Sequence, residues 1–132
     1  MKRRILILED DQNMRLFLKA YLEDHFEVVT AKDGYEGMKR ILAGVKLDLI
    51  VVDASLSGIN SVALLTQLRE SDFSWNIPVV VIGSKHAQDE LRQCLDLGVA
   101  AIFVKPFDPQ KFLNKIQQVL LTSARGGSGV SY

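Results

Sequence analysis

Five apolar runs divide the chain at nearly regular intervals. They span residues 5–8, 26–29, 47–52, 77–82 and 99–104. The first, third and fourth runs are almost continuous and rich in Ile and Val, which is typical of strands that are buried on both faces of a parallel sheet. The second run is shorter and contains Glu27, which favours a strand at the edge of the sheet.

The stretches between these runs carry apolar residues at helical spacing. In the first stretch, Met14, Phe17, Leu18 and Tyr21 lie at positions i, i+3, i+4 and i+7, which form one face of a helix. Less strict versions of the pattern follow each later run. Strands that alternate with helices are typical of βαβ units. The pattern therefore predicts an α/β fold with five parallel strands and five helices, wound on both faces of an open sheet.

Composition narrows the class of protein further. The chain has 132 residues, and its 16 Lys and Arg balance its 16 Asp and Glu. This length predicts one domain, and the neutral balance argues against nucleic acid as the main partner. No apolar run approaches the ~18 residues of a membrane span. The single cysteine, Cys94, excludes an internal disulfide and fits a reducing compartment, so we expect a cytoplasmic location.

The last ten residues differ in composition from the rest of the chain. Residues 123–132 contain three glycines and three serines, without any apolar periodicity. This composition is typical of flexible linkers. We therefore expect an ordered domain over residues 1–122 and a flexible tail or linker over residues 123–132.

Charged residues follow three of the predicted strands. Glu9, Asp10 and Asp11 follow the first run, Asp53 comes after the third, and Lys105 follows the fifth. In an open α/β sheet, ligands bind beyond the carboxyl ends of the strands. Carboxylates ~5 Å apart repel by roughly 3 kcal/mol at an effective dielectric constant near 20, so their convergence requires a cation. Oxygen ligands favour Mg²⁺, and an ammonium group beside the metal favours phosphoryl transfer onto a carboxylate.

Together these motifs resemble those of the response-regulator receiver domain, the CheY-like superfamily of two-component signalling. The resemblance rests on residues 5–11 (ILILEDD), Met14-Arg15, Asp53 and residues 105–107 (KPF). It covers residues 2 to about 121 and implies the flavodoxin-like strand order 2-1-3-4-5. It also implies a phosphorylated signalling switch, not a stand-alone enzyme. The expected partners are a histidine kinase or histidine phosphotransfer protein, and a downstream protein or an effector domain missing from this sequence.

The resemblance implies a role for each residue of the site. Asp53 would accept the phosphoryl group. Asp11 and Asp53 would bind Mg²⁺ directly, together with the backbone carbonyl of Ser55, and Asp10 would bind it through water. Lys105 would pair with the phosphoryl oxygens, and its peptide bond to the following proline is expected to be cis.

Three positions depart from the family pattern. Gly83 ends the fourth run where the family usually has a Ser or Thr hydroxyl. Ser84 follows it, but adjacent side chains of a strand point to opposite faces. Ile102 stands where the family usually has an aromatic residue. We therefore expect an altered conformational switch, and the alternative is a receiver-fold interaction module that is independent of phosphorylation. An enzyme of the aspartyl-phosphatase type is disfavoured, because Ser55 stands where a second Asp is expected.

Overall fold

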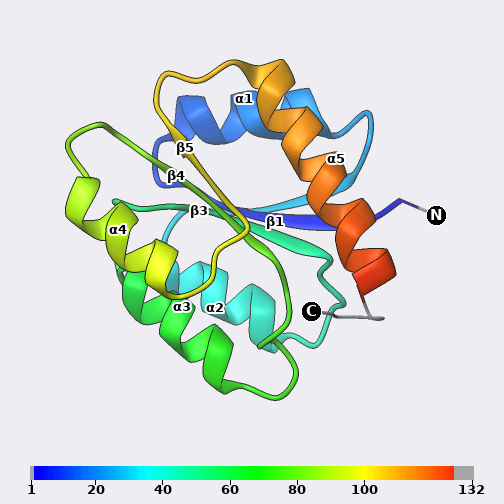
Figure 1. The fold of residues 1–132 in the computed structure, drawn as a ribbon, viewed down its shortest axis with the longest axis horizontal. Coiled ribbons are helices and arrows are strands. Elements are labelled where there is room, and N and C mark those ends of the chain that lie inside the picture. Colours follow the sequence, from blue (N-terminus) through cyan, green and yellow to red (C-terminus); the bar gives the residue numbers. More distant parts are fainter. Residues whose placement is uncertain (1, 127–132) are drawn as a thin grey trace.

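The five strands form a single parallel sheet in the order β2-β1-β3-β4-β5 (Figure 1). The computed structural model describes residues 2–126, with side chains for residues 2–123. The strands are β1 Arg4–Leu8, β2 Glu27–Ala31, β3 Leu49–Asp53, β4 Val79–Gly83 and β5 Ala101–Val104. This arrangement confirms the fold class and strand order expected from the sequence. It also places the strand that contains Glu27 at an edge.

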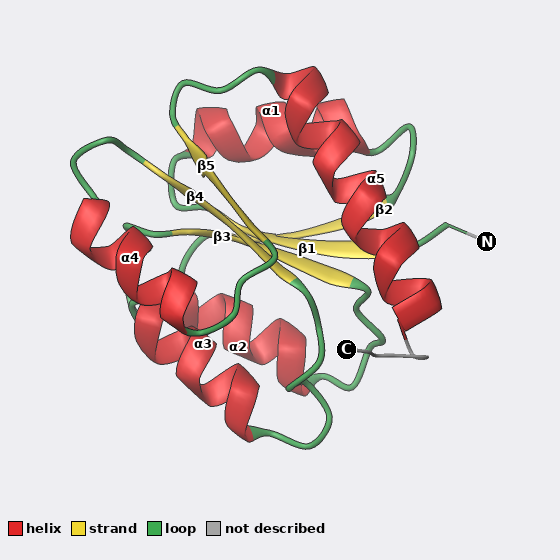
Figure 2. Cartoon of the chain, viewed as in Figure 1, coloured by secondary structure: helices red, strands yellow, loops and turns green. Residues whose placement is uncertain are grey.

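Five helices cover the two faces of the sheet. They are α1 Gln12–Leu22, α2 Gly34–Leu42, α3 Ser61–Glu70, α4 Gln88–Asp96 and α5 Pro109–Gly126. Figure 2 shows α1 and α5 on one face, and α2, α3 and α4 on the other. Within the described part of the chain, no helix combines the length and the apolar character needed to cross a bilayer.

The central strands send alternate side chains into two apolar cores. In β1, Ile5 and Ile7 join the core beneath α1 and α5, whereas Leu6 and Leu8 join the core on the opposite face. Every residue of β3 and β4 is buried. Because both faces of these strands are covered, every position favours an apolar residue, which explains the continuous apolar runs.

The last helix extends beyond the boundary predicted from composition. The tail was expected to begin at residue 123, but α5 continues to Gly126. The buried side chains of Phe112, Ile116 and Leu120 anchor this helix on the sheet. Once a helix is anchored, each further residue adds a hydrogen bond at little cost, and Ala and Arg are strong helix formers. The rest of the predicted tail, residues 127–132, lies outside the described residues.

Candidate functional site

Asp53 lies at the carboxyl end of the central strand β3. Its side chain is buried, and the whole residue is only 5% exposed. Lys105 Nζ donates a hydrogen bond to Asp53 Oδ2 at 2.9 Å, and the Ser55 backbone N–H donates to Asp53 Oδ1 at 2.8 Å. Because β3 lies between the parallel strands β1 and β4, the loops that follow these two strands begin beside this carboxylate. The structure thus brings together Asp53 and Lys105, as the sequence predicted.

Glu9 is the second buried carboxylate of the site, and it is 1% exposed. One of its oxygens accepts a hydrogen bond from Lys105 Nζ at 3.2 Å, and the other accepts from the Asp11 backbone N–H at 3.1 Å. Carboxylate oxygens of Glu9, Asp10 and Asp53 all lie within 4.8 Å of one another. These three acids form the acidic cluster of the site.

Asp11 lies outside the acidic cluster, contrary to the sequence prediction. It is the N-cap residue of α1, and its Oδ1 accepts a hydrogen bond from the Asn13 backbone N–H at 3.3 Å. An N-cap carboxylate satisfies a backbone donor that has no partner within the helix. The third acid of the Glu-Asp-Asp run therefore begins the helix, while the first two face Asp53. The acid pair of the site is Glu9 and Asp10, one residue earlier than predicted.

Two further features lie in the loops that carry these side chains. Arg15 Nη1 donates to the carbonyl of Glu9 at 2.8 Å and to the carbonyl of Asp10 at 3.5 Å. The peptide bond between Lys105 and Pro106 is cis, as expected from the resemblance. Arg15 belongs to the motif that carries the resemblance, but its contact with these two carbonyls depends on the path of the loop, which the sequence pattern does not show.

Burial and close charges shift the pKa values of the three central groups. Burial, followed by the hydrogen bond to Asp53 and the charge of Asp53, raises the pKa of Glu9 from 4.5 to about 8. Burial alone would raise the pKa of Asp53, but hydrogen bonds from Glu9 and Lys105 hold it below its ordinary value. Burial opposes the ammonium form of Lys105, yet the two carboxylates raise its pKa. These directions favour a protonated Glu9 beside an ionised Asp53 at neutral pH when no metal ion is bound.

Comparison with known protein families agrees with this geometry. Residues 5–117 match the family model of the response regulator receiver domain. The chain belongs to this family. The response regulators ArlR of Staphylococcus saprophyticus and of Staphylococcus aureus are each 32% identical over 118 residues. These matches cover 89% of this chain but 52% of ArlR, so the receiver domain spans about half the length of these curated relatives.

Solved receiver structures share the same fold. Chemotaxis response regulator CheY4 of Vibrio cholerae superposes with a TM-score of 0.81 at 22% identity, over 90% of this chain and 99% of CheY4. A CheY-like receiver domain protein of Methanospirillum hungatei gives 0.86 at 24% identity, over 95% and 98% of the two chains. The receiver domain of a histidine kinase of Syntrophus aciditrophicus gives 0.84 at 23% identity, over 98% of each chain.

In this receiver domain, Leu91 fills the space beside Gly83. A Cβ atom built on Gly83 would lie 2.8 Å from Leu91 Cδ2, a carbon on the buried face of α4. The hydroxyl of the next residue, Ser84, accepts a hydrogen bond from the His86 backbone N–H at 3.2 Å, within the loop that leads to α4. The glycine noted in the sequence is thus matched by a leucine from the facing helix.

Successive residues of β5 alternate between the two cores. Ile102 packs with the core beneath α2, α3 and α4, and Phe103 packs with the core beneath α1 and α5. The Phe103 ring lies 5.2 Å from the Phe112 ring, centroid to centroid, in an edge-to-face arrangement. Phe103 therefore packs on the face opposite to Ile102 and does not replace the aromatic residue that the family usually has at that position.

The raised pKa of Glu9 makes the stability of the metal-free domain depend on pH. The folded Glu9 keeps its proton up to about pH 8, whereas an unfolded glutamate loses it near pH 4.5. The contribution of the Glu9 proton to the free energy of unfolding is complete below pH 4.5 and is lost as the pH rises to about 8. The lowered pKa of Asp53 changes the stability only in more acidic solution, and the raised pKa of Lys105 changes it only in more alkaline solution.

We therefore expect the unfolding free energy in EDTA to fall between pH 5 and pH 8, by a few kcal/mol at most, as measured by urea unfolding. Glu9→Gln replaces the protonated carboxyl by an amide that does not ionise, so it should flatten this dependence. Glu70→Gln, at an exposed position of α3, is the control and should leave the slope unchanged. If the unfolding free energy of Glu9→Gln depended on pH as steeply as that of the wild type, the assignment of this dependence to Glu9 would be wrong.

Proposed function

We propose that this receiver domain accepts a phosphoryl group on Asp53 from the phosphohistidine of a histidine kinase or histidine phosphotransfer protein. The observation that carries the proposal is the buried Asp53 carboxylate, held 2.9 Å from Lys105 Nζ and beside two further acids. A carboxylate oxygen of Asp53 attacks phosphorus, the phosphorus–nitrogen bond to histidine breaks, and the imidazole leaves with the electron pair and takes up a proton. Lys105 offsets negative charge on the phosphoryl oxygens.

The acidic cluster fits a hard divalent cation. All the side-chain donors are carboxylate oxygens, which Mg²⁺ prefers, and oxygens of three carboxylates lie within 4.8 Å of one another. We propose that Asp10, Asp53 and the backbone carbonyl of Ser55 hold Mg²⁺, and that Glu9 contacts it through water. When bound, Mg²⁺ neutralises charge between the carboxylates and the incoming phosphoryl group. Asp11 has no part in this set, because its carboxylate caps α1.

We propose that the output of this domain lies outside the sequence at hand. The match to ArlR covers only 52% of that protein, which leaves room for an effector domain. Alternatively, the domain transmits its signal to a separate downstream protein. We place the domain in the cytoplasm, where its single cysteine would stay reduced, and we expect it to bind neither nucleic acid nor membrane directly.

We also propose that phosphorylation changes the conformation of this receiver only weakly. Gly83 offers no hydroxyl to a phosphoryl group, and a Cβ atom at this position would lie 2.8 Å from Leu91 Cδ2, so a larger side chain would require Leu91 to move. A hydrogen bond to a charged group contributes roughly 1.5–3 kcal/mol, and a ligand shifts two states only by its differential interaction with them. The same observation favours a second candidate function, an interaction module that does not depend on phosphorylation.

The phosphorylation proposal predicts an acyl phosphate on Asp53. Incubation with a small-molecule phosphodonor and Mg²⁺ should add the mass of one phosphoryl group, as detected by intact mass spectrometry. Asp53→Asn should abolish the addition, because an amide is a poor nucleophile, and Lys105→Ala should slow it strongly. Asp33→Asn, which changes the carboxylate that caps α2, is the matched control and should be labelled normally. Labelling that persists in Asp53→Asn would refute the assignment.

The metal proposal distinguishes the two neighbouring aspartates. At ten times its dissociation constant, Mg²⁺ should stabilise the fold by about 1.4 kcal/mol and raise the melting temperature. Asp10→Asn should abolish this rise. Asp11→Asn should retain it, because asparagine caps a helix as well as aspartate does. The reverse pattern would restore Asp11 as the ligand, and a wild-type protein that shows no rise in 10 mM Mg²⁺ would contradict a metal site.

The weak switch is tested with a beryllofluoride mimic of the phosphoryl group, read by backbone NMR shifts across α4, β5 and α5. We expect small shifts in the wild type. The double variant Gly83→Thr/Leu91→Ala should enlarge them, because it adds a hydroxyl and removes the side chain that would collide with it; Leu91→Ala alone is the control. The added bond corresponds to a roughly 10- to 150-fold change in the ratio of the two states. Large shifts in the wild type that survive Ser84→Ala would overturn this proposal.

A further inference from the structure

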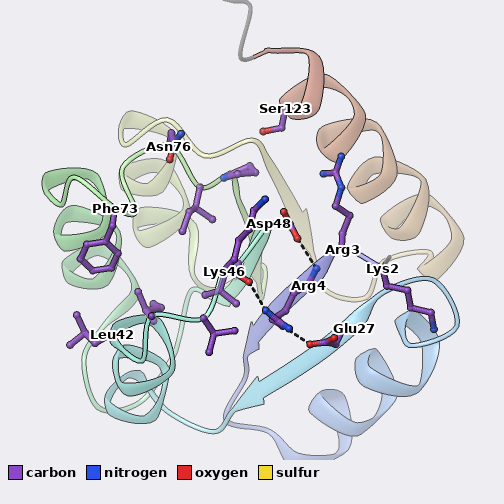
Figure 3. Close-up of a pocket in the computed structure, with 16 residues that line it drawn as sticks. Lys2, Arg3, Arg4, Glu27, Leu42, Lys46, Asp48, Phe73, Asn76 and Ser123 are labelled. Carbon is purple, nitrogen blue, oxygen red and sulfur yellow. Dashed lines mark hydrogen bonds and ion pairs between the residues drawn. The ribbon is translucent and has the colours of Figure 1, made fainter.

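A cavity of about 1060 Å³ opens at the amino ends of the strands (Figure 3). Its walls come from the start of β1, the loop between α2 and β3, and the loop between α3 and β4, with the end of α5 at its rim. A five-residue strand is roughly 16 Å long, so this cavity is separated from Asp53 by the length of the sheet. We call it the amino-end groove and define it by Arg3, Leu42, Val45, Lys46, Phe73 and Pro78.

One side of the amino-end groove is apolar and exposed. Leu42 is 63% exposed and Phe73 is 59% exposed, although both are large apolar side chains, and Val45 is also exposed. Single exposed apolar residues are ordinary on a protein surface. Several such residues around one cavity are typical of an interaction site. Figure 3 shows Phe73 and Leu42 on the same side of the opening.

The loop that presents Phe73 is held in one conformation. The Ser74 hydroxyl is buried and donates to the carbonyl of Leu68 at 2.9 Å. Arg69 donates to the carbonyls of Trp75 and Ile77 in this loop, both at 3.0 Å, and to the carbonyls of Leu97 and Gly98 in the loop before β5. Because the loop is already ordered, a partner that contacts Phe73 would not have to order it on binding.

Basic side chains also line the groove, and Figure 3 shows Lys2 and Arg3 on the side away from Phe73 and Leu42. Four basic and two acidic side chains line the cavity. One acid, Glu27, is already paired with Arg4, and the Asp48 carboxylate accepts the Arg4 backbone N–H at 2.8 Å. Among the residues that the structure describes, Arg3 and Lys46 belong to no salt bridge. Unpaired cationic groups beside exposed apolar side chains are complementary to a ligand that is both acidic and apolar.

We propose that the amino-end groove binds an acidic segment of a partner protein. Its apolar side chains would contact Phe73 and Leu42, and its carboxylates would face Arg3 and Lys46. A concave groove accommodates a peptide chain better than the flat surface of a membrane. The two acids in its lining and the zero net charge of the chain disfavour nucleic acid. The proposal is independent of the phosphoryl chemistry at Asp53.

The test is a selection of random 15-residue peptides displayed on phage, with the full chain as bait. Peptides that bind the Phe73→Ala/Lys46→Glu double variant are removed. Enriched sequences should contain more Asp and Glu than Lys and Arg, together with large apolar residues. In fluorescence polarisation with synthetic copies of these peptides, Phe73→Ala and Lys46→Glu should each weaken binding by about tenfold or more, a change of about 1.4 kcal/mol.

Two matched controls change the same chemistry elsewhere on the surface. Leu95→Ala removes an apolar side chain of α4 that is also 59% exposed, and Lys111→Glu reverses an exposed charge of α5. Both should bind the peptides within about twofold of the wild type, because two-fold corresponds to only about 0.4 kcal/mol. Circular dichroism should show that all four variants are folded.

Several outcomes would overturn the proposal. Failure to enrich peptides over the double variant would do so, as would enrichment of neutral or basic peptides, or equal loss of binding in the controls. A wild-type dimer in sedimentation that Phe73→Ala dissociates would assign the groove to a second copy of this chain. Binding to phosphatidylserine vesicles that Lys46→Glu abolishes, without peptide enrichment, would assign it to a membrane surface.

Discussion

The site depends on one ammonium group that lies between two buried carboxylates. Lys105 follows β5 and contacts both Glu9, which follows β1, and Asp53, which ends β3. Their oxygens lie within 4.8 Å of each other, and at an effective dielectric constant near 20 two ionised carboxylates at this distance would repel by roughly 3 kcal/mol. The ammonium group of Lys105 offsets this repulsion, so its two ion pairs connect the ends of three strands. The strand order makes the contact possible, because β1, β3 and β4 are neighbours and β5 completes the edge.

The fold could be predicted from the sequence because strands that are covered on both faces of the sheet appear as continuous apolar runs. Continuous Ile and Val runs mark the central strands, and Glu27 marks an edge. The site was only partly predictable. Strand ends located Asp53 and Lys105, but a periodic pattern does not show at which residue a helix begins. The choice between Glu9 and Asp11 therefore depended on the cap of α1, which uses the last of three consecutive acids.

The sequence showed that a hydroxyl is missing at Gly83, but it did not show what takes its place. Leu91 lies eight residues later, and its contact with Gly83 depends on how α4 packs against β4. That packing is a tertiary property, which no local pattern reports. The same limit applies to the amino-end groove, whose lining comes from both ends of the chain and from two loops between them.

Arg69 has a consequence for the geometry of the distant site around Asp53. Its guanidinium group joins the loop before β4, at Ile77, to the loop before β5, at Leu97. The two strands are thereby aligned at their beginnings, and at their ends the Lys105 backbone N–H donates to the carbonyl of Gly83 at 2.8 Å. A planar fork of five donors can hold several carbonyls at fixed angles, which a lysine cannot reproduce. The register that brings the Lys105 ammonium within reach of its carboxylates is thus clamped at both ends of one strand pair.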